Sequence, residues 1–464
     1  MNKIPSPESP GITRSPEGKS WKTGTLTYTF SGLLALFFWL LLGDFAWTLR
    51  DRSAMPTAQW YLQHLGVSNL LFGLLLSSLP AFIGLFLGPI ISVKSDRHRG
   101  KWGRRIPFLL VTTLIAVLGM LGMGCAPLIA VAVPRFFPHQ SATGAAVLSF
   151  GIFWAAFEIA VLTSRLVFDG LINDVVPKEL LGRFYGCFRA IGLIIGMVFN
   201  FWITGKVPKH FSLILVLIAV FYGACTVWMC LNVKEGEYPP PPPPAPDREG
   251  WGRGIVGGAR LYFKECFTSR YYFCVFVFLM TSALSFVPVN TFAMPYALSL
   301  GIDTDVYGKY LALTYLISFC LSFFLGWLSD IFHPLRVTMA TLLGFAVLTA
   351  WAGIYATTPT TFLIAWVLHG VLSGCYLTSS ASLGQRLFPH EKFAQFASAV
   401  LMLTGPTTVV LAPLVGRAVD KTGHVYRYTF AAGCLLSCVA LLAAWRAHRD
   451  FMKFGGPKYY VAPE

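Results

Sequence analysis

The chain is built from long runs of apolar residues that contain no charged side chain. Between Lys22 and Asp44 lie 21 uncharged residues, about the number that a helix needs to cross the roughly 30 Å hydrocarbon core of a bilayer. The longest run has 49 uncharged positions between Arg336 and Arg386, and a polar stretch with a proline at 357–361 divides it, which predicts a turn between two helices. The pattern predicts twelve transmembrane helices.

We therefore expect an all-α membrane protein in which two pseudo-symmetric bundles of six helices are joined by one polar segment. The expected helices are 25–48, 68–93, 106–131, 144–165, 186–205, 210–231, 272–296, 306–328, 336–356, 361–382, 394–416 and 427–446. The N-terminal bundle spans 25–231 and the C-terminal bundle 272–446, with cytoplasmic tails at 1–24 and 447–464. The segment 232–271 contains six consecutive prolines, which predict a stiff cytoplasmic spacer, followed by a basic and aromatic stretch that suits a helix at the membrane interface.

Composition and charge agree with this topology. Hydrophobic residues make up 55% of the chain and charged residues 12%, more apolar surface than one soluble core could bury. Of the 36 lysines and arginines, 27 fall on the side of the two tails, so we expect both termini in the cytoplasm. This asymmetry explains the net charge of +15 without a nucleic-acid partner. We expect a bacterial inner (plasma) membrane location, with the lipid bilayer as the surroundings.

The polar segments offer nothing that an enzyme would need. The ten cysteines are scattered without metal-ligand spacing, and small apolar packing residues explain them. The short soluble segments show no phosphate-binding loop and no nucleophile with a neighbouring base. We therefore expect no catalytic activity, no metal and no cofactor.

Two loop features occur once in each half. Ser95-Asp96 follows the second expected helix, and Ser329-Asp330 follows the eighth. A loop with Pro177, Glu179 and Arg183 likewise has a looser counterpart at 389–393. Repeated features at matching positions are typical of transporters built from duplicated halves.

The first of these loops reads Gly88-Pro-Ile-Ile-Ser-Val-Lys-Ser-Asp96-Arg-His-Arg-Gly-Lys-Trp-Gly-Arg-Arg-Ile-Pro107. It resembles motif A of the Major Facilitator Superfamily, and its longer form looks like the branch of glycoside-pentoside-hexuronide:cation symporters and sucrose/proton symporters. The core returns as Gly326-Trp-Leu-Ser-Asp330. One departure is Ser92, where the motif has glycine, although serine is also small enough for close helix contact.

The resemblance implies a gate that holds the cytoplasmic side shut in the outward-open state and releases when the halves rock. A glycine-permitted turn allows a tight reversal, Asp96 can meet the positive N-terminus of a helix, and arginines can pair with acids such as Glu179. Basic residues that only fix the topology are the simpler alternative. The expected gate residues are Ser92, Asp96, Arg97, Gly103, Arg104, Arg105, Gly326, Asp330, Asp174, Glu179, Arg183 and Arg189.

Ionisable residues inside expected helices are candidates for function, because a charge at membrane depth is costly and usually faces a cavity. Glu158 lies in the middle of the fourth helix and Arg165 follows seven residues later, on the same face. Protonation of Glu158 could free Arg165 for a substrate, whereas a static charge pair is the plainer interpretation. Asp44, in the outer third of the first helix, is the third candidate, since some sugar/proton symporters of this superfamily have a proton-binding acid on that helix.

In the superfamily's fold, the first, fourth, seventh and tenth helices line the central path. Their polar and aromatic candidates for contact with a substrate are Asn290, Tyr296, His369 and Tyr376, although helix packing can also explain such residues. The second expected helix, 68–93, contains no acid, unlike the sodium-coupled melibiose-type members. H⁺ as coupling ion, or transport with no coupling ion at all, is therefore favoured over Na⁺.

Together these features predict a secondary active transporter that moves a small-molecule substrate, a sugar or glycoside, by alternating access with proton coupling. Two alternatives stay open at this point. The cargo could be a lysolipid, a muropeptide or a drug-like compound, or the protein could be a membrane assembly or sensor protein that transports nothing.

Overall fold

The computed structural model describes residues 14–15, 18–136, 141–238, 262–389 and 392–463. The proline run and most of the stretch expected to lie at the interface fall outside these ranges. Within them the fold is almost entirely helical. The exceptions are two small antiparallel hairpins before the first helix, β1 (Arg14–Ser15) with β2 (Gly18–Lys19) and β3 (Trp21–Thr23) with β4 (Leu26–Tyr28).

The N-terminal half contains six spans. They are α1 (Phe30–His64), a second span made of α2 (Asn69–Gly73), the π-helix η1 (Leu74–Ser78) and α3 (Leu79–Arg97), then α4 (Ile106–Phe136), α5 (Ala142–Val175), α6 (Lys178–Trp202) and, after the short 3₁₀ helix η2 (Thr204–Lys206), α7 (Val207–Asn232).

The C-terminal half repeats this number. Its first span is α9 (Arg270–Ser285) with α10 (Val287–Ser299), and the others are α11 (Thr304–Phe332), α12 (Pro334–Tyr355), α13 (Pro359–Ser380), α15 (Phe393–Lys421) and α16 (Tyr428–Lys453). Two short helices, α14 (Leu383–Leu387) and α17 (Gly456–Tyr459), lie outside the spans.

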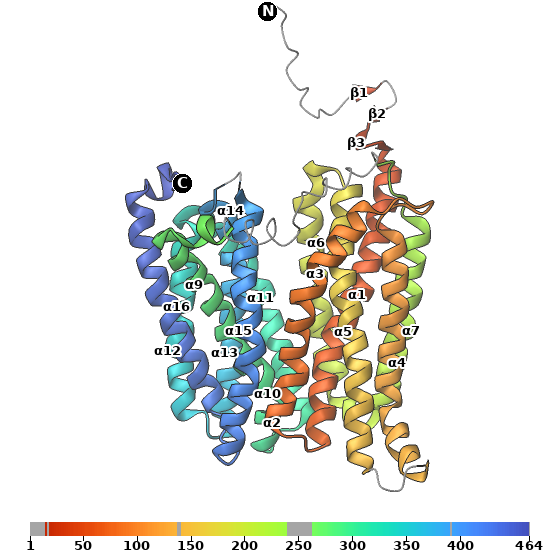
Figure 1. Ribbon diagram of the computed structural model, residues 1–464, viewed down its shortest axis with the longest axis vertical. Helices are drawn as coiled ribbons and strands as arrows, with labels where there is room; N and C mark the ends of the chain where they lie inside the picture. Colours follow the sequence, from red (N-terminus) through yellow and green to blue (C-terminus); the bar gives the residue numbers. More distant parts are fainter. Residues whose placement is uncertain (1–13, 16–17, 137–140, 239–261, 390–391, 464) are drawn as a thin grey trace, which may run out of the picture.

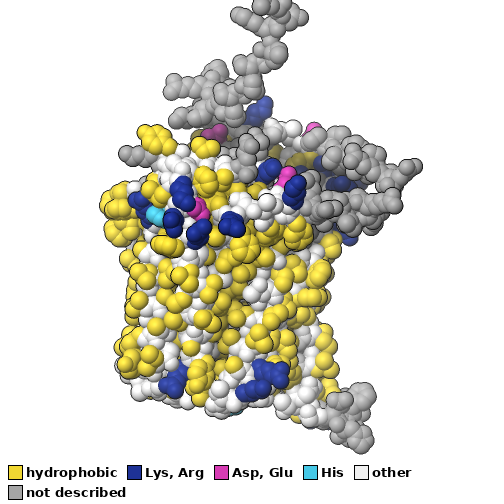
Figure 2. Space-filling view, turned by 60° about the vertical axis from the view of Figure 1, so that its left-hand side comes forward, with side chains coloured by type: hydrophobic (Ala, Val, Ile, Leu, Met, Phe, Trp, Pro, Cys, Tyr) yellow, Lys and Arg dark blue, Asp and Glu magenta, His cyan; other side chains and the backbone are white. Residues whose placement is uncertain are grey.

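Ten segments of the described chain are long and apolar enough to cross a membrane, and one of them, Glu179–Asn232, contains both α6 and α7. These ten segments therefore contain eleven spans, and α11 is the twelfth, as predicted. The chain is an integral, multi-pass membrane protein. Figure 2 shows the corresponding surface, an apolar band with lysine and arginine side chains gathered near its two rims.

The two halves stand side by side, and the start of α1 and the end of α16 lie at the same end of the molecule (Figure 1). The charge asymmetry predicts that this end faces the cytoplasm, and it is called the cytoplasmic end below. Contacts between the halves are made by α6 with α11, by α1 with α10, and by α15 with α2, η1 and α3.

Three expected boundaries are wrong by eight residues or more. The fourth helix was expected to end at residue 165 and the fifth to begin at 186, but α5 continues to Val175 and α6 begins at Lys178. The first helix was expected to end at residue 48, with the charges that follow in an outer loop, but α1 continues to His64. Arg50, Asp51 and Arg52 therefore lie within a span. Arg50 is wholly buried and the other two line or approach a cavity, so none of the three charges has to face lipid.

Candidate functional site

A cavity of about 1040 Å³ lies between the two halves. Its walls come from α1, α5 and α6 of the N-terminal half and from α10, α11 and α13 of the C-terminal half. The lining reaches Asn173 and Tyr185 on α5 and α6 and Leu377 on α13, all near the cytoplasmic ends of their helices. The cavity therefore extends from mid-membrane toward the cytoplasm.

The extracellular end is closed by contacts that join the halves. Asp420 of α15 accepts hydrogen bonds from the main-chain N–H groups of Asn69 and Leu70 (3.1 and 3.0 Å) and from the side-chain amide of Asn69 (2.7 Å). The Asn69 amide also contacts His424 Nδ1 (3.1 Å), and its oxygen accepts from the Tyr426 hydroxyl (3.0 Å). A carboxylate at the first turn of α2 is stabilised by the helix dipole as well.

Close helix contact reinforces this seam. A Cβ at Gly73 would stand 2.8 Å from the carbonyl oxygen of Ala412, and one at Gly416 would overlap the carbonyl oxygen of Asn69. Ser78 donates to the carbonyl of Val409 (2.6 Å) a turn further in. The cavity is therefore closed at the end away from the two termini and extends toward the end that carries them.

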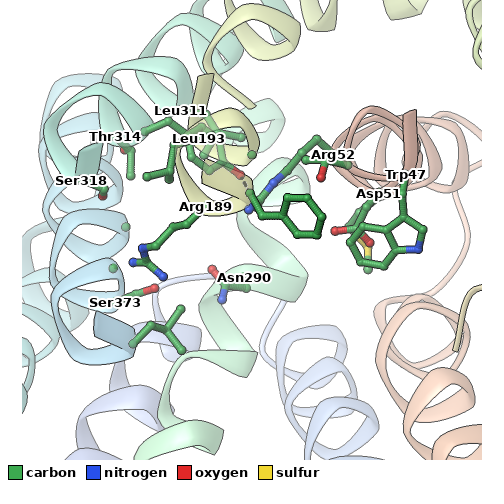
Figure 3. Close-up of a pocket in the computed structure, with 18 of the residues that line it drawn as sticks. Trp47, Asp51, Arg52, Arg189, Leu193, Asn290, Leu311, Thr314, Ser318 and Ser373 are labelled. Carbon is green, nitrogen blue, oxygen red and sulfur yellow. Dashed lines mark hydrogen bonds between the residues drawn. The ribbon is translucent and has the colours of Figure 1, made fainter. Parts of the chain in front are cut away.

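Six charged side chains line the cavity: Asp44, Asp51, Arg52, Arg165, Asp169 and Arg189. Of the predicted candidates, Asp44 and Arg165 are therefore in the cavity wall. Arg189 was expected in the cytoplasmic gate, yet it lines the cavity and donates to Thr378 Oγ1 of the other half (2.6 Å). Figure 3 shows Arg52 and Arg189 reaching into the space between the halves.

Glu158 and Arg165, expected to act as a pair, have different surroundings. Arg165 is exposed to the cavity and stacks over Trp47, whereas Glu158 is only 8% exposed and does not line it. The nearest charges that act on Glu158 are Arg50 and Asp51 of α1.

Arg50 is an unusual residue for a membrane bundle. It is 0% exposed and none of its three side-chain nitrogens has a hydrogen-bond partner in the described structure. Its guanidinium lies 4.6 Å from the ring centre of Tyr222, 4.9 Å from that of Trp47 and 5.8 Å from that of Phe157. Cation–π contacts thus surround the charge, and the nearby Glu158 is close enough to interact with it electrostatically.

The candidates of the C-terminal half separate into two groups. Asn290 lines the cavity and its amide oxygen contacts Nε2 of the buried His369 (3.0 Å), so His369 orients Asn290 from behind. Tyr296 and Tyr376 do not line the cavity. Tyr296 donates to the carbonyl of Ala356 and Tyr376 bonds Ser282 (2.6 Å), both within buried helix packing.

At the cytoplasmic end, two arginines of the loop before α4 pair with Asp174 near the end of α5. Asp174 accepts from Arg104 (2.5 and 3.0 Å) and from Arg105 (3.2 Å), and Arg105 also donates to Ser95 (2.6 Å). Glu179, which the sequence suggested as a partner, is exposed on the first turn of α6. Asp174, near the end of α5, is therefore the acid that contacts the loop, whereas Glu179 at the start of α6 is exposed.

Glu235, just after α7, holds the same loop. Its carboxylate accepts from the main-chain N–H groups of Arg104, Arg105 and Ile106 at 2.8–2.9 Å, where α4 begins. Gly103 has a positive φ of 93°, and a Cβ there would collide with Glu235. The glycine of the motif is therefore required both for the turn and for the approach of this carboxylate.

The remaining gate candidates are placed by their backbones. Ser92, Asp96 and Arg97 lie at the cytoplasmic end of α3, Arg183 in the first part of α6, and Gly326 and Asp330 in the last part of α11. The side chains of Ser92, Asp96, Arg183 and Asp330 lie outside the described part of the structure. Arg97 is exposed.

Several residues of the site were missed by the sequence analysis, namely Arg50, Asp51, Arg52, Asp169, Tyr315, Asp420 and Glu235. A signal for the first three exists, because no glycine interrupts the chain between Gly43 and Gly66, so the first helix could have been extended through the charges.

Comparisons with known proteins agree with the geometry. The sequence model of the Major Facilitator Superfamily matches residues 287–453. No curated protein matches the sequence.

Solved structures resemble almost the whole chain. A bacterial homologue of the human lysosomal transporter Spinster, inward-facing and unoccupied, has a TM-score of 0.63 at 16% identity over 93% of this chain and 98% of its own. A D-xylose–proton symporter gives 0.60 at 14% identity over 93% and 98%. The nucleoside transporter NupG gives 0.62 at 12% identity over 90% and 99%. This chain is therefore a multi-pass membrane protein with the fold of these transporters, and its residues 287–453 match the sequence model of the Major Facilitator Superfamily.

Proposed function

We propose that the protein is a secondary active transporter that carries a small polar solute through the central cavity by alternating access. The main support for this proposal is the cavity. It lies between two similar halves, extends to the cytoplasmic side and is closed at the outer end by contacts between the halves. Such a site is accessible from one side at a time if the halves rock about it.

The proposed cargo is a sugar or glycoside. The loop that ends at Pro107 resembles that of sugar symporters, and a D-xylose–proton symporter is among the structural neighbours. Trp47, Tyr307 and Trp366 offer aromatic faces in the cavity wall, and Asn290 and Ser373 offer polar groups. Aromatic faces suit the CH surfaces of a sugar, and the polar groups suit its hydroxyls.

The proposed coupling ion is H⁺, taken up by Glu158. Glu158 lies outside the cavity wall beside the buried Arg50, so it can change its charge without touching the solute. Protonation would leave Arg50 as an uncompensated buried cation, which is costly and so favours a rearrangement of α1 against α5. Asp44, which lines the cavity, is the second acid that could take part.

The cytoplasmic gate is proposed to consist of the loop before α4 and its partners. In the inward-facing arrangement Arg104 and Arg105 are bound to Asp174, within the N-terminal half. We expect them to contact the other half when the cytoplasmic side closes. A bacterial inner membrane is the proposed location, with both termini in the cytoplasm.

The test is uptake of radiolabelled sugars and glycosides into proteoliposomes, with and without an inward proton gradient. We expect uptake that is driven by the gradient and lost in Glu158→Gln, while Asp450→Asn, whose ion pairs stay within α16, behaves as wild type. Gradient-independent uptake that Glu158→Gln leaves unchanged would exclude proton coupling. No uptake of any solute tested would favour an assembly or sensor role.

A further inference from the structure

The charges of the cavity are not neutralised by ion pairs. Among the described residues no ion pair within 4 Å joins any two of Asp44, Asp51, Arg52, Arg165, Asp169 and Arg189. Ionised side chains at membrane depth are costly unless they are paired, hydrated or bound to a ligand. Six of them around one cavity indicate what the cavity receives.

Two arginines form a positive region. Arg52 donates to the Tyr315 hydroxyl of α11 (3.0 Å), and Arg189 donates to Thr378 of α13, so each guanidinium turns toward a neutral group of the opposite half. Arg52 is near enough to act electrostatically on Arg189. Asp51 is the acid that acts on Arg52, and in Figure 3 it lies beside Trp47 on the α1 side. Two cations and one anion leave this region one positive charge in excess.

A second region has the opposite sign. Asp169 acts electrostatically on Asp44, and Arg165 is the cation that acts on Asp169, one helical turn away on α5. Arg165 also lies over Trp47, with its guanidinium 5.7 Å from the ring centre. Two anions and one cation leave this region one negative charge in excess.

The acid at position 44 and the cation at position 52 lie at different depths of the same cavity. Asp44 and Arg52 are eight residues apart on α1, a rise of roughly 12 Å along the helix axis.

We propose that the solute is a zwitterion, with an anionic group, such as a carboxylate, held by Arg52 and Arg189 and a cationic amine held by Asp44 and Asp169. Binding supplies each region with the charge that it lacks, and the anionic group also meets Tyr315 and Thr378 of the C-terminal half. The positive region therefore bridges the halves through the solute. The inference rests on the proposed transport function, and it replaces a neutral sugar by a polar solute that has both charges.

The test is isothermal titration calorimetry of the purified full-length protein in detergent with four related sugars. Muramic acid has an amine and a carboxylate, N-acetylmuramic acid only the carboxylate, glucosamine only the amine and N-acetylglucosamine neither. We expect muramic acid to bind at least about tenfold more tightly than each of the others, with the difference shrinking at high salt.

Variants separate the two regions. Arg52→Gln and Arg189→Gln should abolish the preference for a carboxylate and keep that for an amine, and Asp44→Asn and Asp169→Asn should do the reverse. A change of preference between ligands cannot result from a general loss of folded protein. Arg446→Gln, at an exposed site on α16, is the control and should bind as wild type.

Equal affinity for all four sugars, no binding of muramic acid, or an equal loss of every ligand in all four variants would overturn the proposal. Because the titration needs no gradient, its outcome is separate from that of the uptake experiment. Charge-dependent binding of muramic acid without its uptake into proteoliposomes would remove the transport function and leave the zwitterion site in place.

Discussion

The extracellular seam allows a quantitative test of the inward-facing arrangement. Asp420→Ala removes the carboxylate that accepts from two main-chain N–H groups and one side-chain amide at the start of α2. Those donors belong to the N-terminal half and Asp420 to the C-terminal half. The substitution therefore weakens the closed seam without changing the packing inside either bundle.

The magnitude follows from the number of bonds and their exposure. A hydrogen bond to a charged group contributes about 1.5–3 kcal/mol when it is well buried. The Asp420 side chain is 25% exposed, so water can replace part of this when the carboxylate is lost. We take about 2 kcal/mol for the three bonds together, which corresponds to a roughly 30-fold shift away from the closed seam. Asp420→Asn keeps one acceptor oxygen and should shift it about fivefold.

Hydrogen exchange measured by mass spectrometry reads this shift directly. Peptides that contain Asn69–Gly73 and the end of α15 should exchange about 30-fold faster in Asp420→Ala and about fivefold faster in Asp420→Asn. Asp450→Ala, which removes a carboxylate bound only within its own helix, should leave both peptides unchanged. Exchange at the wild-type rate in Asp420→Ala would refute the assignment of this contact as the extracellular latch.

Three further predictions concern the seam and the cytoplasmic surface. Gly416→Val should prevent α15 from closing on Asn69, so the same seam peptides should exchange faster than in wild type even though Asp420 is intact. Glu235→Gln should lower the melting temperature by several degrees, because it weakens three hydrogen bonds to the start of α4 and so reduces the free energy of unfolding by about 1–3 kcal/mol. Glu237→Gln, at an exposed site, is the control and should leave the melting temperature unchanged. An unchanged melting temperature in Glu235→Gln would contradict the bracing role. Burial, and to a smaller extent the neighbouring arginines, lowers the pKa of His333 to about 4. The stability that the neutral imidazole contributes is therefore complete above pH 6.5 and is lost as the pH falls toward 4. His333→Asn should flatten the fall in melting temperature over that interval, and an unchanged slope would exclude this role of His333.

The number of spans was predictable because hydrocarbon imposes a simple rule on any helix that faces lipid. The rule weakens where a helix faces the interior, and the first helix shows this. The charges of Arg50, Asp51 and Arg52 suggested a loop. In the structure Arg50 packs against aromatic rings, Arg52 donates to a hydroxyl group and Asp51 lines the cavity, so none of them faces lipid. A charge therefore marks the end of a span only when it must face the hydrocarbon.

The site was predictable only in part, because its partners are far apart in sequence. The loop before α4 was recognised from its residues, yet its acid is Asp174 and its brace is Glu235, about 70 and 130 positions away. Tyr315 lies 263 positions from Arg52. Local patterns identify which residue types can pair, and only packing of the two halves decides which ones do.

The two ends of the molecule hold their charges in different ways, and this difference bears on the proposed cycle. At the outer end Asp420 joins one half to the other, whereas at the cytoplasmic end Arg104 and Arg105 pair with Asp174 of their own half. A carrier needs its two arrangements to differ by only a few kcal/mol, since otherwise one of them is rarely populated. A contact of about 2 kcal/mol at the outer seam is therefore comparable with the whole free-energy difference between the two arrangements. Closing the cytoplasmic side must gain a similar amount from new contacts between the halves, for which the arginines of the gate loop are placed.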